Sequence, residues 1–106
     1  MKEFSVRELK SMIDSGDDFL LVDVREAWEI DVCAIEGSQK IPMGDILTRA
    51  EELKSEAPVI IHCRSGGRSA KVVNALEMQL GLTNLHNLAG GILAWADEID
   101  TSLEKY

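Results

Sequence analysis

The sequence predicts one α/β domain over residues 1–106, in which helices cover both faces of a central parallel sheet. Two short, nearly continuous apolar runs, at residues 19–22 and 59–61, have the pattern of strands buried on both faces. Stretches with the apolar spacing of helices lie before, between and after these runs. Strands that alternate with helices predict a parallel sheet between two helical layers. A chain of 106 residues has room for one hydrophobic core.

The expected elements follow one another along the chain without repeats, linkers or low-complexity segments. Ser5 and Glu8 have the spacing of a capping box, and the helix that they begin is expected to end at Gly16. After it we expect strands at 19–22, 59–61 and 85–88, and helices at 26–32, 45–53, 69–80 and 91–99. The strand at 85–88 has the weakest apolar pattern, and the helix at 69–80 the clearest.

Composition and charge exclude several classes of protein. The hydrophobic fraction of 45% and charged fraction of 28% are ordinary for a globular protein. A net charge of −8 argues against nucleic-acid binding, which requires clustered basic residues. No apolar run is long enough to span a membrane, and no signal peptide precedes the first helix. We therefore expect a cytoplasmic protein in which Cys33 and Cys63 are reduced thiols.

The residues that follow the second predicted strand combine several features of an anion site. Cys63 ends that strand, the loop Arg64-Ser65-Gly66-Gly67-Arg68 follows, and a helix opens at Ser69. In parallel α/β sheets, ligands bind at the carboxyl ends of the strands. Adjacent glycines let successive amides point inward, and the helix N-terminus adds partial positive charge. Together with Arg64, Arg68 and Lys71, these groups should favour the Cys63 thiolate, which is the nucleophilic form.

Other interpretations of the reactive residue types were weighed against this one. Cys63 alone would suit an ordinary buried cysteine, but that does not explain the arginines, the glycines and the helix start beside it. The loop lacks the lysine of a phosphate-binding P-loop, and the cysteine and histidine spacings match no zinc motif, so we expect neither metal nor cofactor. His62 should face away from Cys63, because neighbouring strand residues point to opposite faces.

Cys33 and the two tryptophans are expected to pack rather than to react. Cys33 is interpreted as a half-buried apolar residue and not as a second reactive thiol. Trp28 and Trp95 are interpreted as packing residues and not as parts of a ligand site.

The motifs, taken in order, resemble those of the rhodanese superfamily. The segment from Cys63 to Ser69 resembles its active-site loop, and Asp23-Val24-Arg25 followed by Glu29 resembles its D-x-R motif. The segments 35–38 and 41–42 resemble H-I-P-G-A and I-P, with Ala34 and Glu36 as departures. The segment 88–91 with Trp95 resembles a late G-G-x-x-x-W motif. The resemblance covers essentially the whole chain.

The resemblance implies a three-layer rhodanese-like fold and a sulfurtransferase. Cys63 would take sulfane sulfur from a donor, such as thiosulfate or a protein persulfide, and pass it to a thiophilic acceptor. The loop residues Arg64, Ser65, Gly66, Gly67, Arg68 and Ser69 would hold the persulfide and the donor anion. Asp23, Arg25 and Glu29 would form bracing ion pairs.

Within the superfamily, the chain is most similar to rhodanese domains fused to ubiquitin-activating-like adenylyltransferases. Those domains sulfurate a small carrier protein, which makes a sulfur-carrier protein a possible acceptor here.

Two alternatives share the fold. Cysteine-based phosphatases and arsenate reductases have one more residue between their cysteine and arginine than the four residues, 64–67, of this loop. The shorter loop suits a sulfur atom better than a phosphoryl group. A catalytically limited binding module of rhodanese fold is the other alternative. Such modules usually lose the cysteine or disrupt the loop, and this chain keeps both.

Overall fold

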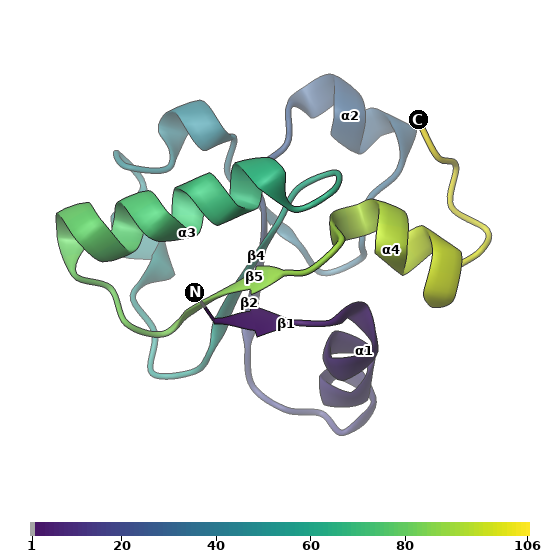
Figure 1. Ribbon diagram of the computed structural model, residues 1–106, viewed down its shortest axis with the longest axis horizontal. Helices are drawn as coiled ribbons and strands as arrows, with labels where there is room; N and C mark the ends of the chain where they lie inside the picture. Colours follow the sequence, from purple (N-terminus) through teal and green to yellow (C-terminus); the bar gives the residue numbers. More distant parts are fainter. Residues whose placement is uncertain (1) are drawn as a thin grey trace.

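A five-stranded parallel sheet forms the centre of the computed structural model, which describes residues 2–106 (Figure 1). Its strands lie in the order β1-β5-β4-β2-β3, and all four neighbouring pairs are parallel. The strands are β1 (Glu3–Phe4), β2 (Leu20–Asp23), β3 (Gln39–Lys40), β4 (Val59–His62) and β5 (Leu85–Leu88). The predicted parallel α/β fold is therefore confirmed.

Two hydrophobic cores lie on the two faces of this sheet. The helices are α1 (Val6–Asp14), α2 (Ala27–Val32), α3 (Gly67–Leu80) and α4 (Gly91–Glu98), with 3₁₀ turns η1 (Met43–Asp45) and η2 (Ala50–Leu53). One core joins α1 and α4 to side chains such as Leu21 and Ile60. The other joins α3 and the segment 46–53 to Val22, Ile61 and Cys63. Alternate residues of β2 and β4 thus serve opposite faces, as expected for strands buried on both sides.

The segment 45–53 is the one helix predicted wrongly. Of the four apolar residues expected on one face, Ile46, Ala50 and Leu53 are buried but Leu47 is exposed, and the backbone forms η1 and η2 instead of one α-helix. The carbonyl oxygen of Asp45 accepts both the Thr48 hydroxyl, at 2.9 Å, and the Arg49 amide, at 3.1 Å, so one helical bond forms there without continuing into an α-helix. The two short turns bury three of the four apolar residues, so the spacing indicated burial but not the backbone conformation.

The remaining differences from the predicted elements are small. The capping box of α1 is present, with the Glu8 amide 3.0 Å from Ser5 Oγ and the Ser5 amide 3.0 Å from Glu8 Oε1. Helix α3 begins at Gly67, two residues earlier than expected. Strands β1 and β3 were not predicted, because two residues each are too few to show an alternating pattern.

The chain returns to the carboxyl edge of the sheet after α4, where its last residues lie beside α2 (Figure 1). Among residues 2–106, no helix has both the length and the apolar character needed to cross a bilayer.

Candidate active site

The turn between β4 and α3 holds Cys63 at the carboxyl edge of the sheet. Its thiol is almost fully buried, and three donors surround Sγ: the Gly66 amide at 3.1 Å and the amide and hydroxyl of Ser69, each at 3.4 Å. Gly66 is the N-cap of α3 and has φ of 108°, a conformation that glycine adopts readily and other residues do not. This backbone turns the first amides of α3 toward the sulfur, as the predicted anion nest requires.

Hydrogen bonds control the acidity of this thiol. Burial raises the pKa of Cys63, but hydrogen bonds from the Ser69 hydroxyl and from the amides of Ser69, Gly66 and Ser65 outweigh it. The pKa therefore lies below its ordinary value, which increases the thiolate fraction at neutral pH. Ser65 contributes only its amide, because its side chain is exposed to solvent.

Arg68 is held by a carboxylate from α2. Its two terminal nitrogens lie 2.7 and 2.6 Å from the two carboxylate oxygens of Glu29, which is buried. The bond to Arg68 lowers the pKa of Glu29 to about 2, so the pair stays ionised. Glu29 Oε2 also accepts the Glu26 amide at 2.9 Å, which ties the start of α2 to the loop.

A second ion pair braces the end of β2. Arg25 and Asp23 are both fully buried, with Arg25 Nη2 2.8 Å from Asp23 Oδ2. Arg25 also donates to the carbonyl oxygens of Glu29, at 3.2 Å, and Cys33, at 2.7 Å. Nε, Nη1 and Nη2 of this buried guanidinium thus all have partners, in Asp23, in or just after α2, and in Tyr106, which lowers the cost of burying the charge.

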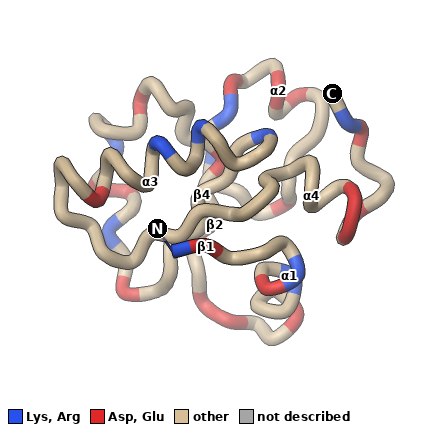
Figure 2. The backbone as a smooth tube through the Cα atoms, in the orientation of Figure 1, with Lys and Arg blue, Asp and Glu red and all other residues tan. Residues whose placement is uncertain are grey.

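The other two predicted cations are placed differently. Arg64 donates from Nε to the backbone oxygen of Tyr106 at 2.8 Å, and its guanidinium carbon lies 5.1 Å from the centre of the Tyr106 ring. Lys71 lines an apolar hollow between α3 and the segment 43–47. Basic residues do mark the loop and the first turns of α3 in Figure 2. The main stabilisation of the thiolate nevertheless comes from amides and one hydroxyl, and not from free arginine charge.

Asn87 belongs to this site although the sequence analysis passed over it. From the end of β5 it donates to the Gly66 carbonyl at 3.3 Å and to Glu3 Oε2 at 3.1 Å, and accepts the Ser69 hydroxyl at 2.5 Å. It therefore fixes both the loop and the hydroxyl beside the sulfur. The sequence did contain a signal for Asn87: it is a polar residue in the short apolar strand 85–88, near the carboxyl end, where ligand sites form in parallel sheets.

A second missed feature is the contact between the loop and the start of α4. The amides of Ile92 and Leu93 donate to the carbonyls of Cys63 and Arg64, each at 3.0 Å. Gly91 permits this approach, since a Cβ there would lie 2.6 Å from both carbonyl oxygens. The late Gly-Gly motif thus holds the backbone of the Cys63 loop.

His62 and Cys33 both lie away from the reactive thiol. His62 is fully buried with Nε2 3.0 Å from Ser38 Oγ, and burial lowers its pKa to about 4, so its ring is neutral at pH 7. This confirms a packed, hydrogen-bonded histidine. Cys33 is buried in the core under α1 and α4, whereas Cys63 is in the core under α3. Both thiols are free.

The two tryptophans differ from each other. Trp95 is buried against α1, as predicted. Trp28 was expected to pack as well, but 62% of it is exposed, and its ring meets the edge of Tyr106 at 5.7 Å between centres.

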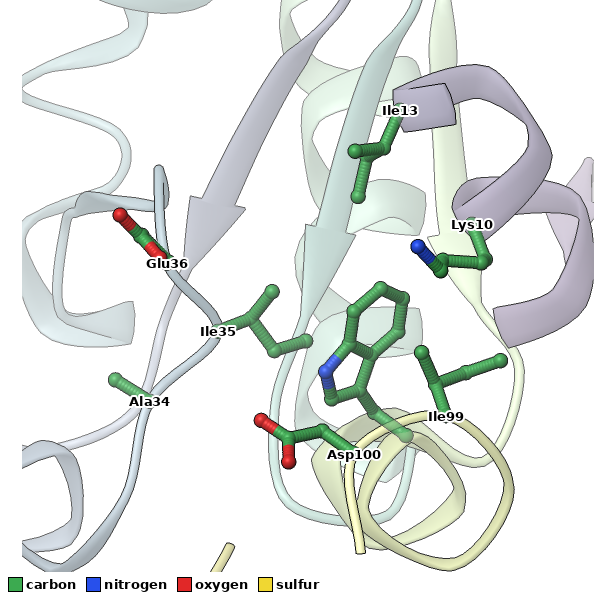
Figure 3. A pocket seen from close by; sticks show the side chains of 8 residues that line it. Lys10, Ile13, Ala34, Ile35, Glu36, Ile99 and Asp100 are labelled. Atoms are coloured by element: carbon green, nitrogen blue, oxygen red, sulfur yellow. The ribbon is translucent and has the colours of Figure 1, made fainter. Parts of the chain in front are cut away.

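A hollow outside this site lies on the side of the sheet that carries α1 and α4. It has a volume of about 510 Å³ and is bounded by α1, the end of α4 and the segment 34–36, and Trp95 is one of the residues that line it (Figure 3). Ala34 and Glu36, the two departures from the family pattern, form part of its wall. No residue of the Cys63 loop lines this hollow.

The site thus places a thiol in a nest of amides after a buried strand, which is the arrangement expected of an anion site. Comparison with known proteins shows the family. The model of the family described as "Rhodanese-like domain" matches residues 5–98. The chain therefore belongs to the rhodanese-like domain family.

Relatives and solved structures agree with this assignment. A protein of Allochromatium vinosum named "Sulfurtransferase" is 38% identical over 91% of this chain and 89% of its own length. A rhodanese-like domain protein from Staphylococcus aureus superposes with a TM-score of 0.84 at 33% identity, covering 100% of this chain and 99% of that one.

The similarity to adenylyltransferase fusions is also confirmed. The probable adenylyltransferase/sulfurtransferase MoeZ of Mycobacterium tuberculosis is 33% identical over 94% of this chain. The chain spans about a quarter of that protein, since 26% of MoeZ is covered.

Proposed function

We propose that the protein is a sulfurtransferase that carries sulfane sulfur as a persulfide on Cys63. The observation that supports this best is the ring of donors around a buried thiol, with Gly66 N, Ser69 N and Ser69 Oγ all within 3.4 Å of Sγ. The same donors suit a persulfide anion, whose negative charge lies one sulfur atom further along.

The proposed reaction has two displacements at sulfur. With thiosulfate as donor, the Cys63 thiolate attacks the outer sulfur atom, a new S–S bond forms, and sulfite leaves with the electron pair of the broken bond. A thiolate of the acceptor then attacks the terminal sulfur of the persulfide, and Cys63 departs as a thiolate. A lowered pKa assists both steps, because Cys63 is first the nucleophile and then the leaving group.

The donor and the acceptor are proposed by class. A small anionic sulfur donor or a protein persulfide fits a site with two arginines on its loop. The similarity to MoeZ supports a small sulfur-carrier protein as one possible acceptor. We also propose that the protein acts in the cytoplasm, which fits its two free thiols.

Sulfur loading on Cys63 tests this proposal directly. Wild-type protein, mixed with thiosulfate and desalted, should gain the mass of one sulfur atom, and cyanide should remove it as thiocyanate. Cys63→Ser should gain nothing, while Cys33→Ser, the matched control, should load like the wild type because Cys33 lies in the other core. Loading that persists in Cys63→Ser would exclude the proposed mechanism.

The same experiment separates the two alternatives. A phosphatase would hydrolyse an aryl phosphate, and the mass of the protein would not change on treatment with thiosulfate. A catalytically limited binding module would neither hydrolyse the aryl phosphate nor gain sulfur. We expect loading with almost no phosphatase activity, since four residues separate Cys63 from Arg68 and the ring of donors closes tightly on one sulfur atom.

A further inference from the structure

Tyr106, which lies outside every motif of the family, contacts Arg64 of the Cys63 loop and also Glu29, the partner of Arg68. Its hydroxyl donates to Glu29 Oε1 at 2.9 Å and accepts from Arg25 Nη1 at 3.0 Å. Glu29 in turn holds Arg68 through two bonds. The tyrosine hydroxyl therefore joins the network that fixes one loop arginine.

The rest of Tyr106 covers the other loop arginine. Its backbone oxygen accepts from both Nε and Nη2 of Arg64, and its ring lies 5.1 Å from the guanidinium carbon. The pair Nε and Nη2 is one of the edges with which an arginine binds two oxygens of an anion. That edge, and one face of the guanidinium, are occupied by Tyr106.

We propose that Tyr106 is a specificity-determining residue that competes with the sulfur donor for Arg64. An anionic donor must displace Tyr106 to bind the Nε and Nη2 edge of this guanidinium, whereas a neutral donor gains nothing by doing so. The inference rests on the proposed function, because it takes Arg64 as a group that meets the donor. Tyr106 would thereby set the apparent affinity of the site for an anionic donor.

Displacement is feasible because the segment 101–106 is held at few points. It contains no helix or strand, and four of its six residues are exposed. Besides the contacts of Tyr106, Leu103 packs partly against the core, and Lys105 pairs with Asp97 on the surface. Ser102 and the Leu103 amide bond only to the nearby Asp100.

Binding of thiosulfate to a protein that cannot transfer sulfur tests the proposal. In a Cys63→Ser background, the dissociation constant is measured by calorimetry with residue 106 as Tyr, Phe or Ala. If Tyr106 covers Arg64 nine times in ten, uncovering it tightens binding about tenfold. Tyr106→Ala keeps the backbone oxygen but loses the ring over Arg64 and the hydroxyl that anchors the residue, so we expect thiosulfate to bind about three to ten times more tightly. Tyr106→Phe loses only the hydroxyl anchor, and we expect about twofold tighter binding.

The matched control is Lys105→Ala, which alters the same segment but touches neither arginine, and it should leave the dissociation constant unchanged. Weaker or unchanged binding in Tyr106→Ala would overturn the proposal, and so would a lack of binding in all the variants. Because this protein performs no transfer, the result is independent of sulfur loading on wild-type Cys63. Failure of the proposed function would appear only in the loading experiment.

Two further measurements link the effect to Arg64. In an Arg64→Ala background, Tyr106→Ala should no longer tighten binding, and tightening that persists there would overturn the role of Arg64. Trp28 meets the edge of the Tyr106 ring at 5.7 Å, so displacement should change its fluorescence as thiosulfate is added. That change should vanish in Trp28→Phe, and its absence with Trp28 present would contradict displacement.

Discussion

Two turns at the carboxyl edge of the sheet have the same construction and different uses. One follows β4 and contains Gly66-Gly67, and the other follows β5 and contains Gly90-Gly91. Each places a glycine with positive φ at the N-cap of a helix, 108° at Gly66 and 80° at Gly90. In both, the first amides of the helix point at groups in front of it.

What stands before those amides differs between the turns. After β4, the amides of Gly66 and Ser69 face the sulfur of Cys63. After β5, the amides of Ile92 and Leu93 face the carbonyls of Cys63 and Arg64. The second turn thus holds the backbone of the first and leaves its sulfur free. The same local structure therefore acts as an anion site where its amides face a sulfur atom. It acts as a clamp on the backbone where its amides face carbonyl oxygens.

The largest expected effect comes from breaking the clamp with Gly91→Ala. A Cβ at Gly91 would lie 2.6 Å from the carbonyl oxygens of Cys63 and Arg64, and φ of 57° adds backbone strain. We expect the free energy of unfolding to fall by about 3–5 kcal/mol, measured by urea denaturation. Sulfur transfer should fall as well, because the loop loses its support.

Gly16→Ala is the matched control for Gly91→Ala. Gly16 has φ of 70° but no atom within 4 Å of a Cβ built there, so its substitution reports backbone strain alone, about 1–2 kcal/mol. An equal loss of stability in the two variants would show that the close approach of the two turns is unimportant.

The first turn differs from the second in having an ion pair, between Arg68 and Glu29, and low pH should weaken that pair. The pKa of Glu29 falls from 4.5 to about 2, chiefly because of its bond to Arg68. A carboxylate with a depressed pKa stabilises the fold fully above its unfolded pKa, and this contribution is lost as the pH falls through 4.5 toward 2. The loss amounts to about 3 kcal/mol.

Denaturation of the wild type and Glu29→Gln at several pH values measures this contribution. The variant should be less stable at pH 7 but should lose less stability between pH 5 and pH 2, because it has no carboxyl group at position 29 to titrate in that range. Parallel pH curves for the two proteins would mean that Glu29 is not the titrating group.

The two glycines of the first turn should respond unequally. Gly66 has φ of 108°, and its amide lies 3.1 Å from the sulfur, so Gly66→Ala should cost about 1–2 kcal/mol of stability and slow sulfur loading. Gly67 has no positive φ, and a Cβ there meets open space. Gly67→Ala should change stability by less than about 0.5 kcal/mol. Loading rates and urea denaturation of both variants check this, and an inactive Gly67→Ala would contradict it.

The sequence predicted the elements around the first turn well, because their evidence is local. The apolar run 59–61, the glycines and the apolar stripe of α3 are neighbours in the chain, and the structure keeps them adjacent. The same logic failed at 45–53, where a repeat of buried residues could not distinguish an α-helix from two 3₁₀ turns.

Local sequence patterns could not predict which residues far apart in the chain contact each other. Arg68 pairs with Glu29, 39 residues away, and Arg64 with Tyr106, 42 residues away. A count of basic residues near Cys63 therefore overstated the free positive charge. The position of Asn87 beside Gly66 likewise depends on β5 lying next to β4, which only the sheet order reveals.

The smallest expected effect concerns the Ser69 hydroxyl, the side-chain donor that accompanies the amides around the Cys63 sulfur. The Ser69 hydroxyl lies 3.4 Å from Sγ but only 2.5 Å from Asn87 Oδ1, and its single hydrogen is shared between these acceptors. Ser69→Ala should raise the pKa of Cys63, since a donor to the thiolate is lost while the amides remain. A bond worth about 1 kcal/mol changes the thiolate fraction about fivefold, so alkylation of Cys63 by iodoacetamide at pH 7 should slow by that factor and recover at high pH. Ser65→Ala is the control, because Ser65 keeps its amide and its side chain is exposed. Equal rates for the two variants at pH 7 would leave the amides alone responsible for the acidity of Cys63.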